Sequence, residues 1–397
     1  MVVPTPSTRR LVELDALRGL AVVGIVLMNV YAFALPLQAY YKPAAYGAES
    51  AADRVIWAVS FVFIEDKFRT LFAMLFGAGC LILWERETDR PLRTHYARMA
   101  VLFAIGLGHS ILLANNDVLR GYAFAGLVLP FLMQLSHRAL YAVAIGFVWV
   151  HVGGGIVLFG GSILDLYAGR MGTDASLFVE RNFGTDEPAL RYALQLGNEG
   201  FGERIARRWA DIPSQLRVVA GSVPINLAAM TLGMALWKDR MFAREWRIFR
   251  MQRLAAISAA ISLPMLLLLA WWVADNGFPG ALVGASSLIF SAPFDTLLAL
   301  SYAALAMAFF NAPGKLTKHL AAVGRLALTN YLMSSVMLAA IFASWGLGLF
   351  GEVSRSQAFA LGLIPIIAIC LWSPIWFKHL GNGPFERFWR LGVRLLS

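Results

Sequence analysis

Charged residues and cysteines are both scarce in this chain of 397 residues. Lys, Arg, Asp and Glu make up 15% of it, whereas a typical soluble domain has about 25%, and 59% of the residues are hydrophobic with a mean hydropathy of +0.64. A soluble fold of this composition would expose dozens of apolar side chains to water. The shortage of charge therefore excludes an ordinary soluble domain and indicates a membrane protein with many spans.

The two cysteines, Cys80 and Cys370, both lie inside apolar runs, so no disulfide framework and no zinc-ligand spacing is present. We expect neither a metal nor a tightly bound cofactor. The net charge of +10 would suit a nucleic-acid partner, but the basic residues lie in short links between apolar runs. This placement is typical of the excess of Lys and Arg in cytoplasmic loops, so nucleic acid is excluded as a partner.

About ten apolar runs are long enough to cross a bilayer, since a span needs about 20 mostly apolar residues. We therefore predict an all-α, polytopic helical bundle that forms a single transmembrane domain over residues 1–397. The run 54–64 is too short to span alone, and is either a re-entrant or interfacial helix or the first part of one long broken helix. The predicted spans are 17–37, 66–84, 98–114, 118–136, 139–165, 213–237, 254–274, 284–310, 321–349 and 356–377.

The basic links set the orientation, because with ten spans they all fall on one side, which should be the cytoplasm. This predicts a protein of the bacterial inner membrane with both termini cytoplasmic. The segment 166–212 then lies outside as an amphipathic insertion, either a surface cap or a substrate lid. The basic residues that give this orientation include Arg86, Arg90, Arg138, Lys238, Arg244, Lys315, Lys318, Arg387 and Arg394.

His109 and Asp117, in GLGHSILLANNDVLRGYAFAG, form the most informative polar group. An ionisable residue inside a membrane is costly and is by default a functional-site hypothesis. A histidine beside an acid suits proton transfer, so we predict both residues to be catalytic at the extracytoplasmic side. His151 has no acid nearby in sequence, and we expect it to be structural.

Other polar residues are predicted at the same outer depth. Asn29 lies three turns after Arg18 on the first span, and four charges begin the second span: Glu65, Asp66, Lys67 and Arg69. Mutual salt bridges at an interfacial helix end are the plain interpretation, but four charges between two apolar runs are many for anchoring alone. We therefore predict Asn29 and these four residues to bind substrate. Gly77 and Gly79, further along the same span, predict close helix packing.

Two arginines are candidates for holding phosphates on the cytoplasmic side. Arg18 shares a helix face with Asp15, with which it can pair, and Arg325 opens the ninth span in VGRLALTNYLMSS. Asn330 and Tyr331 follow one to two turns deeper and are candidate substrate-binding residues.

Five blocks together resemble the YeiB-like membrane proteins, which carry the domain of unknown function 418. More remotely, the opening LDALRG is similar to the start of transmembrane acyltransferases, which pass an acyl group from cytosolic acyl-CoA to an acceptor across the membrane by means of a histidine. Their histidine lies in a different local motif that is absent here. The five blocks are LDALRGLAVVGIVLMNV, KFRTLFAMLFGAG, GLGHSILLANNDVLRGYA, VGRLALTNYLMSS and GPFERFWR.

The resemblance and the polar groups together favour an acyltransferase. His109 would be the general base, Asp117 its orienting acid, and Arg18 and Arg325 the ligands of acyl-CoA as co-substrate. The acceptor would be a small molecule, a lipid or a sugar, and membrane lipids and a second copy of the chain are the further partners expected. The alternative is a proton-coupled transporter or lipid flippase, in which the same histidine and acid relay protons.

Overall fold

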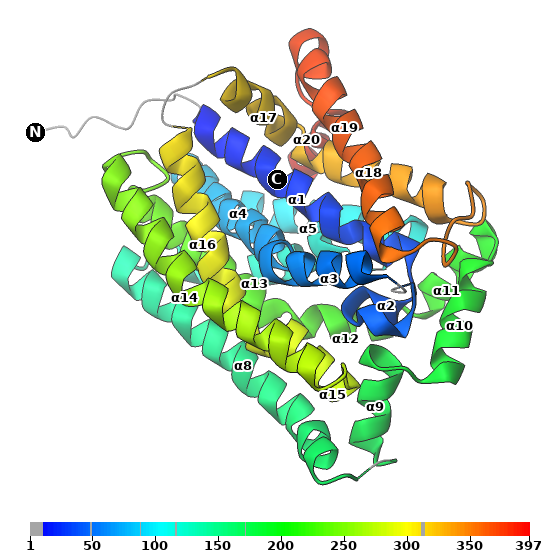
Figure 1. Ribbon diagram of the computed structural model, residues 1–397. Helices are drawn as coiled ribbons and strands as arrows, with labels where there is room; N and C mark the ends of the chain where they lie inside the picture. The colour runs from blue at the N-terminus through cyan, green and yellow to red at the C-terminus, as the bar shows by residue number, and fades with distance from the viewer. Residues whose placement is uncertain (1–10, 48–49, 88, 116, 171, 311–313) are drawn as a thin grey trace, which may run out of the picture.

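A computed structural model describes the chain except for residues 1–10, 48–49, 88, 116, 171 and 311–313 (Figure 1). All regular structure in the described residues is helical, with no strand. Several of the helices are long and apolar enough to cross a membrane. The prediction of an all-α, multi-pass membrane protein is therefore confirmed.

The predicted count of about ten spans is not confirmed. Six helices are long and apolar enough to span, and the number rises to eight if two bent pairs are each one span. The bent pairs are α12 (Ile212–Gly221) with α13 (Val223–Lys238), and α17 (Lys315–Arg325) with α18 (Ala327–Phe342). The six are α1 (Val12–Ala34), α3 with α4 (Ala51–Phe63 and Lys67–Arg86), α8 (His137–Tyr167), α14 (Ile248–Asp275), α16 (Ala292–Phe309) and α19 (Arg355–Leu380).

The largest difference concerns the predicted span 118–136. It folds as α6 (Val118–Gly126) and α7 (Leu129–Leu132), separated by a turn just before Pro130. Pro130 has no backbone N–H to donate and is favoured only in the first turn of a helix. The apolar run is therefore divided into pieces that are each too short to cross a bilayer. Predicted span 98–114 corresponds to the later part of α5 (Pro91–Leu112), which ends two residues before the predicted boundary.

The run 54–64 forms α3, and it continues through a short break into α4 as one 36-residue unit. The break contains Asp66, which has a left-handed backbone with φ of 58°. A non-glycine residue seldom adopts this conformation. The second of the two interpretations, a long broken helix, is therefore the observed one.

Close backbone contact joins α4 to α13. A Cβ added to Gly77 would lie 2.1 Å from the carbonyl oxygen of Met230, and one added to Gly233 would lie 1.8 Å from that of Met74. Small residues at such crossings are typical of helix association in membranes. Gly79 faces open space instead, so its predicted role in packing was wrong.

The segment 166–212, apart from residue 171, contains three short helices that lie far from α17 in Figure 1. The first of them buries Val179 and Phe183 in a cluster with Leu282. The remaining short elements connect or cap the long helices. They are α2 (Leu37–Tyr41), η1 (Pro43–Ala45), α9 (Asp174–Phe183), α10 (Glu187–Gly197), α11 (Phe201–Ala210), α15 (Gly280–Ala285), η2 (Ser286–Phe290) and α20 (Pro384–Leu396).

Candidate functional site

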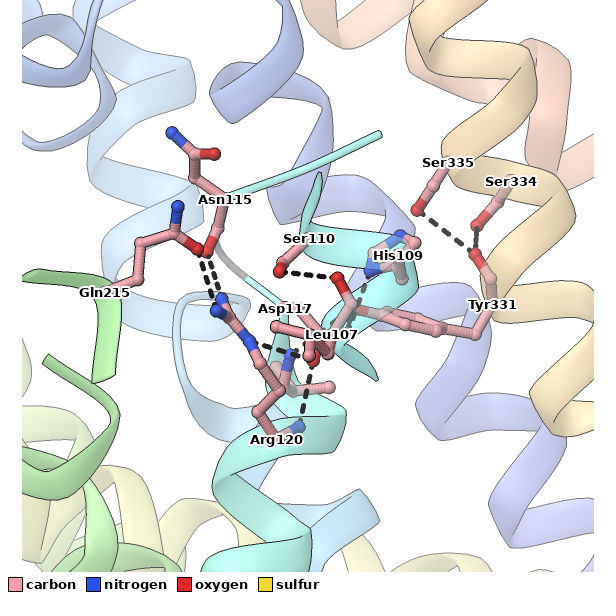
Figure 2. Close-up of polar contacts among 11 residues, drawn as sticks. Leu107, His109, Ser110, Asn115, Asp117, Arg120, Gln215, Tyr331, Ser334 and Ser335 are labelled. Atoms are coloured by element: carbon pink, nitrogen blue, oxygen red, sulfur yellow. Dashed lines mark hydrogen bonds and ion pairs between the residues drawn. The ribbon is translucent and has the colours of Figure 1, made fainter. Parts of the chain in front are cut away.

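His109 and Asp117 form a buried hydrogen-bonded pair where α5 ends and α6 begins (Figure 2). Nδ1 of His109 lies 2.8 Å from Oδ1 of Asp117, and both side chains are almost completely excluded from solvent. Asp117 is the N-cap of α6, and its Oδ2 accepts the backbone N–H of Arg120 at 2.9 Å. Because a cap residue has a fixed position relative to its helix, α6 itself holds the carboxylate against the imidazole.

The side chain of Arg120 supports the same carboxylate from below. Its Nε lies 3.6 Å from Oδ2 of Asp117, and its two terminal nitrogens donate to Oε1 of Gln215 at 2.7 Å and to the carbonyl of Asn115 at 2.8 Å. Arg120 therefore places a buried positive charge beside the acid of the pair. Arg120 and Gln215 were not among the predicted site residues, although Arg120 lies in the same block only three positions after the predicted acid.

Tyr331 of α18 completes the group. Its hydroxyl donates to Oδ1 of Asp117 at 3.3 Å, and its ring centroid lies 5.0 Å from that of His109. The sequence associated Tyr331 with the cytoplasmic opening rather than with the histidine. The 77° bend between α17 and α18 explains the difference, because it turns the start of α18 toward α5 and α6.

Nε2 of His109, the ring nitrogen that does not face Asp117, is the atom of the pair open to a substrate. Nε2 of His109 is buried and has no hydrogen-bond partner in the described part of the chain. His95 and His151 differ in this respect, since Nε2 of His95 contacts the carbonyl of Gly126 and Nε2 of His151 contacts that of Leu288. Because Nδ1 is bonded to the carboxylate of Asp117, Nε2 is the ring nitrogen left open for a further partner.

Close approach of α5 and α6 at this site requires Gly106. An added Cβ there would lie 2.6 Å from Oδ2 of Asp117 and 2.9 Å from the backbone nitrogen of Arg120, whereas one at Gly108 would meet nothing within 4 Å. We expect Gly106→Ala to cost about 1–3 kcal/mol of stability through overpacking and to disturb the pair. Thermal unfolding of purified protein measures this.

Gly108→Ala is the matched control, two positions away in the same helix. It should leave stability unchanged or raise it slightly, because alanine is the better helix former. Equal unfolding temperatures for the two variants would contradict the close packing at residue 106.

A second buried group lies at the break between α3 and α4. Nζ of Lys67 is 2.6 Å from Oδ1 of Asp295 on α16, with exposed fractions of 1% and 3%, and it also donates to the carbonyl of Phe61. Arg69 forms an ion pair with Asp66, the left-handed residue of the break, at 2.9 Å. The sequence predicted Asp66, Lys67 and Arg69 as a group but missed Asp295, although it is a lone acid in an apolar run.

Glu65 and Arg355 are also buried close to the break. Arg355 donates to the carbonyls of Ala39 and Tyr40, and its guanidinium stacks over the ring of Tyr31 at 4.3 Å. Glu65 is 4% exposed, and within the described residues its carboxylate has neither a hydrogen bond nor an ion pair. A buried acid of this kind can bind a proton or a cation.

One helix connects the two buried groups. The hydroxyl of Tyr122 on α6 donates to the carbonyl of Arg69 at 2.7 Å, and its ring stacks on Phe72. Helix α6 thus carries the acid of the histidine pair at its start and contacts the charged break one turn later. Asn29, predicted at the same depth, lies half-buried on α1.

The predicted phosphate ligands share one carboxylate. Arg18 donates to Oδ1 of Asp15 at 2.9 Å and Arg325 donates to Oδ2 at 3.1 Å, and the guanidinium of Arg325 lies over Phe377 at 4.5 Å. The two side chains are 28% and 21% exposed, so they can be reached from water. Two cations against one acid leave the cluster positive.

Asn330 has a structural contact. Its Nδ2 donates to the carbonyl of Val323 and to Oγ of Ser373, both at 2.9 Å, which joins α18 to α19. The predicted substrate-binding amide thus serves to hold Tyr331's helix in place, and it does not join the histidine pair.

The C-terminal helix caps α18. Oε1 of Glu386 on α20 accepts the backbone N–H groups of Leu328 and Thr329 at 2.9 and 3.1 Å. The first N–H groups of a helix have no partner within it, and a carboxylate there is favoured by the helix dipole. The blocks VGRLALTNYLMSS and GPFERFWR, distant in sequence, therefore form one structural unit.

These features define a multi-pass helical membrane protein with a buried His–Asp–Tyr group. The chain belongs to the DUF418 family, described as protein of unknown function, whose family model matches residues 236–395. That range includes Arg325, Tyr331 and Glu386, while His109 and Asp117 lie outside it.

Relatives in three bacteria match almost the whole chain. The chain is 32% identical to the uncharacterized protein YeiB of Escherichia coli strain K12, covering 96% of this chain and 95% of that protein. It is 27% identical to the uncharacterized protein YxaH of Bacillus subtilis strain 168, covering 99% and 96%. An uncharacterized 39.9 kDa protein of Bacillus acidopullulyticus is 24% identical over 98% and 95%.

Proposed function

We propose that this protein is a membrane-embedded acyltransferase with His109 as general base. The observation that supports this most directly is the buried Nε2 of His109, which has no hydrogen-bond partner among the described residues, while the opposite ring nitrogen is held by the carboxylate of Asp117 at 2.8 Å. This is the arrangement by which a neutral imidazole accepts a proton and a nearby acid stabilises the imidazolium that forms. Asp117 and Tyr331 are positioning residues in this proposal.

The proposed reaction transfers an acyl group from acyl-CoA to a hydroxyl or amine. Nε2 takes the acceptor's proton as the acceptor attacks the thioester carbonyl, and a tetrahedral oxyanion forms. Collapse of this intermediate breaks the carbon–sulfur bond. The imidazolium then returns its proton to the departing thiolate, so that the products are the acylated acceptor and free CoA.

In this proposal the protein lies in the bacterial inner membrane with both termini cytoplasmic. The acyl-CoA donor binds at the cytoplasmic side, near Arg18 and Arg325. The basic links between helices support this orientation. Arg325 and Tyr331 are six residues apart across the bend of α17 and α18, so the same chain segment carries the candidate phosphate ligand and the contact to Asp117. The acceptor, a small molecule, lipid or sugar, would enter from the other face.

If the proposal is correct, the purified protein should bind CoA with a millimolar or lower Kd. Arg325→Ala should weaken this binding, and Arg325→Lys should restore only part of it, since a point charge cannot reproduce bidentate contacts to phosphate. Added salt should weaken binding as well, because the site is partly wet. Calorimetric titration measures all three effects.

Arg387→Ala is the control, because Arg387 contributes the same charge on α20 and is exposed. No CoA binding at millimolar concentration, or equal losses in Arg325→Ala and Arg387→Ala, would argue against the cytoplasmic donor site.

A specific observation favours a second candidate, a proton-coupled transporter. The long helix of α3 and α4 is broken at a cluster of buried charges, and two further helix pairs are sharply bent. Broken helices with charged residues at membrane depth are typical of transporters. In this function Glu65 and His109 would carry protons, and transport without release of CoA would distinguish it.

A further inference from the structure

Two cavities flank the C-terminal helix α20 where it lies on α5. The larger, of about 630 Å³, is lined by four arginines, Arg90, Arg98, Arg390 and Arg394, together with Glu87 and Asp89. The smaller, of about 320 Å³, is lined almost entirely by apolar groups, among them Ala100, Ala104, Ile105, Phe388 and Leu396. Helix α20 therefore separates a basic cavity from an apolar one.

The cavities lie at different positions along α5. The basic cavity adjoins its first turns, near Arg90 and Arg98, and the apolar cavity adjoins Ala100 to Ile105. At 1.5 Å per residue the apolar cavity begins about 15 Å further along the helix than the basic one. Between the two cavities Val393 packs on Val101, and Nε1 of Trp389 donates to the carbonyl of Arg98 at 3.4 Å.

The positive charges of the arginines in the larger cavity are only partly balanced by nearby acids. Among the described residues no carboxylate lies within ion-pair distance of Arg98, Arg390 or Arg394. The four arginines also outnumber the two acids of the lining. A cavity with this surplus of guanidinium groups suits a phosphate, which arginine binds with paired N–H donors.

Helix α20 presents apolar side chains outward as well. Phe388, Leu391 and Leu395 are 59%, 56% and 76% exposed. A short helix with one arginine-rich face and one apolar face lies in the interface of a membrane. The cavities on its two sides are then level with lipid headgroups and with the first carbons of acyl chains.

We propose that this groove binds an anionic phospholipid. The phosphate would lie in the basic cavity against Arg98, Arg390 and Arg394, and an acyl chain would reach around α20 into the apolar cavity. A soluble phosphate compound could bind in the basic cavity, but it has no apolar part to bind in the apolar cavity. Because Glu386 of α20 also caps α18, the bound lipid would stabilise the helix that carries Tyr331. The proposal does not depend on acyl transfer.

The test measures thermal unfolding of the full-length protein in a neutral detergent with added lipid. Phosphatidylglycerol should raise the unfolding temperature, since a ligand that binds the folded state stabilises it, and phosphatidylcholine should not. In the variant Arg98→Gln/Arg390→Gln/Arg394→Gln the apparent affinity for phosphatidylglycerol should fall on the order of a hundredfold, because each basic residue near an anionic lipid contributes roughly a factor of five.

The matched control Arg247→Gln/Lys315→Gln/Lys318→Gln removes three exposed charges elsewhere and should keep the full response. A second variant, Ala104→Phe, fills the apolar cavity and should weaken the response without changing charge. The proposal is overturned if phosphatidylcholine stabilises equally, if soluble glycerol phosphate produces the whole effect, or if both triple variants respond like the unmodified protein. If the first triple variant does not fold, Ala104→Phe decides alone.

Discussion

His109→Ala should lower the rate of acyl transfer by on the order of 10²–10⁴-fold, the usual contribution of a positioned general base. Alanine removes the proton acceptor at Nε2, and nothing else at this position can receive the acceptor's proton. The rate is the release of free thiol from acetyl-CoA by native membrane vesicles that contain the protein, with the soluble cell fraction added so that lipid, sugar and small-molecule acceptors are all present. Monodisperse purification of the variant shows that it has folded.

The pair should act as a unit. If Asp117 works only through His109, the double variant His109→Ala/Asp117→Asn should be no slower than His109→Ala alone, since residues that act together are not additive. His151→Ala is the control, because its ring nitrogen already contacts the carbonyl of Leu288 and it should retain its rate. Full activity in a folded His109→Ala protein would reject the general base, and strictly additive losses would reject the coupling.

Lys67→Met should destabilise the protein by about 3–5 kcal/mol, the effect of leaving a buried charge without its partner. Asp295 is 3% exposed on its side chain and would lose the ammonium group at 2.6 Å. Thermal or denaturant unfolding in detergent measures the change. The double variant Lys67→Met/Asp295→Leu should recover most of the stability, because an apolar pair of similar volume carries no desolvation cost.

An exposed ion pair provides the comparison. Arg191 and Glu187 lie 3.2 Å apart on α10 with side chains 73% and 77% exposed, so Arg191→Met should cost less than about 1 kcal/mol. If Lys67→Met were as mild as Arg191→Met, or if the double variant were as unstable as the single one, the pair would not be the buried contact seen here.

Sequence patterns predicted the all-α class and the pair of His109 and Asp117. They did not predict which residues from distant helices contact this pair, for a physical reason. The distance between His109 and Asp117 follows from local chain geometry, because only eight residues separate them and Asp117 is a helix cap. Tyr331 is more than 200 residues away, and its position depends on the bend after Arg325. No periodicity of apolar residues reports the angle of such a bend.

The predicted number of spans was not confirmed, for a related reason. Apolar length identifies a segment that can be buried, but it does not distinguish a crossing helix from short helices enclosed by others. The run 118–136 is apolar enough to be predicted as a span, yet a turn before Pro130 divides it. Partners from distant helices, such as Asp295 for Lys67, were equally invisible, since charge pairing across the bundle leaves no mark in local spacing.

The carboxylate cap on α18 has a consequence for biosynthesis. Thr329 and Glu386 are 57 residues apart, so a ribosome must translate well beyond α18 before its first turn can obtain this cap. Until then the N–H groups of Leu328 and Thr329 lack their carboxylate partner, so the helix that carries Tyr331 has no cap at its N-terminus. The His–Asp–Tyr group can therefore reach its final environment only after α20 has been synthesised and has folded back, and premature termination before residue 386 removes that step.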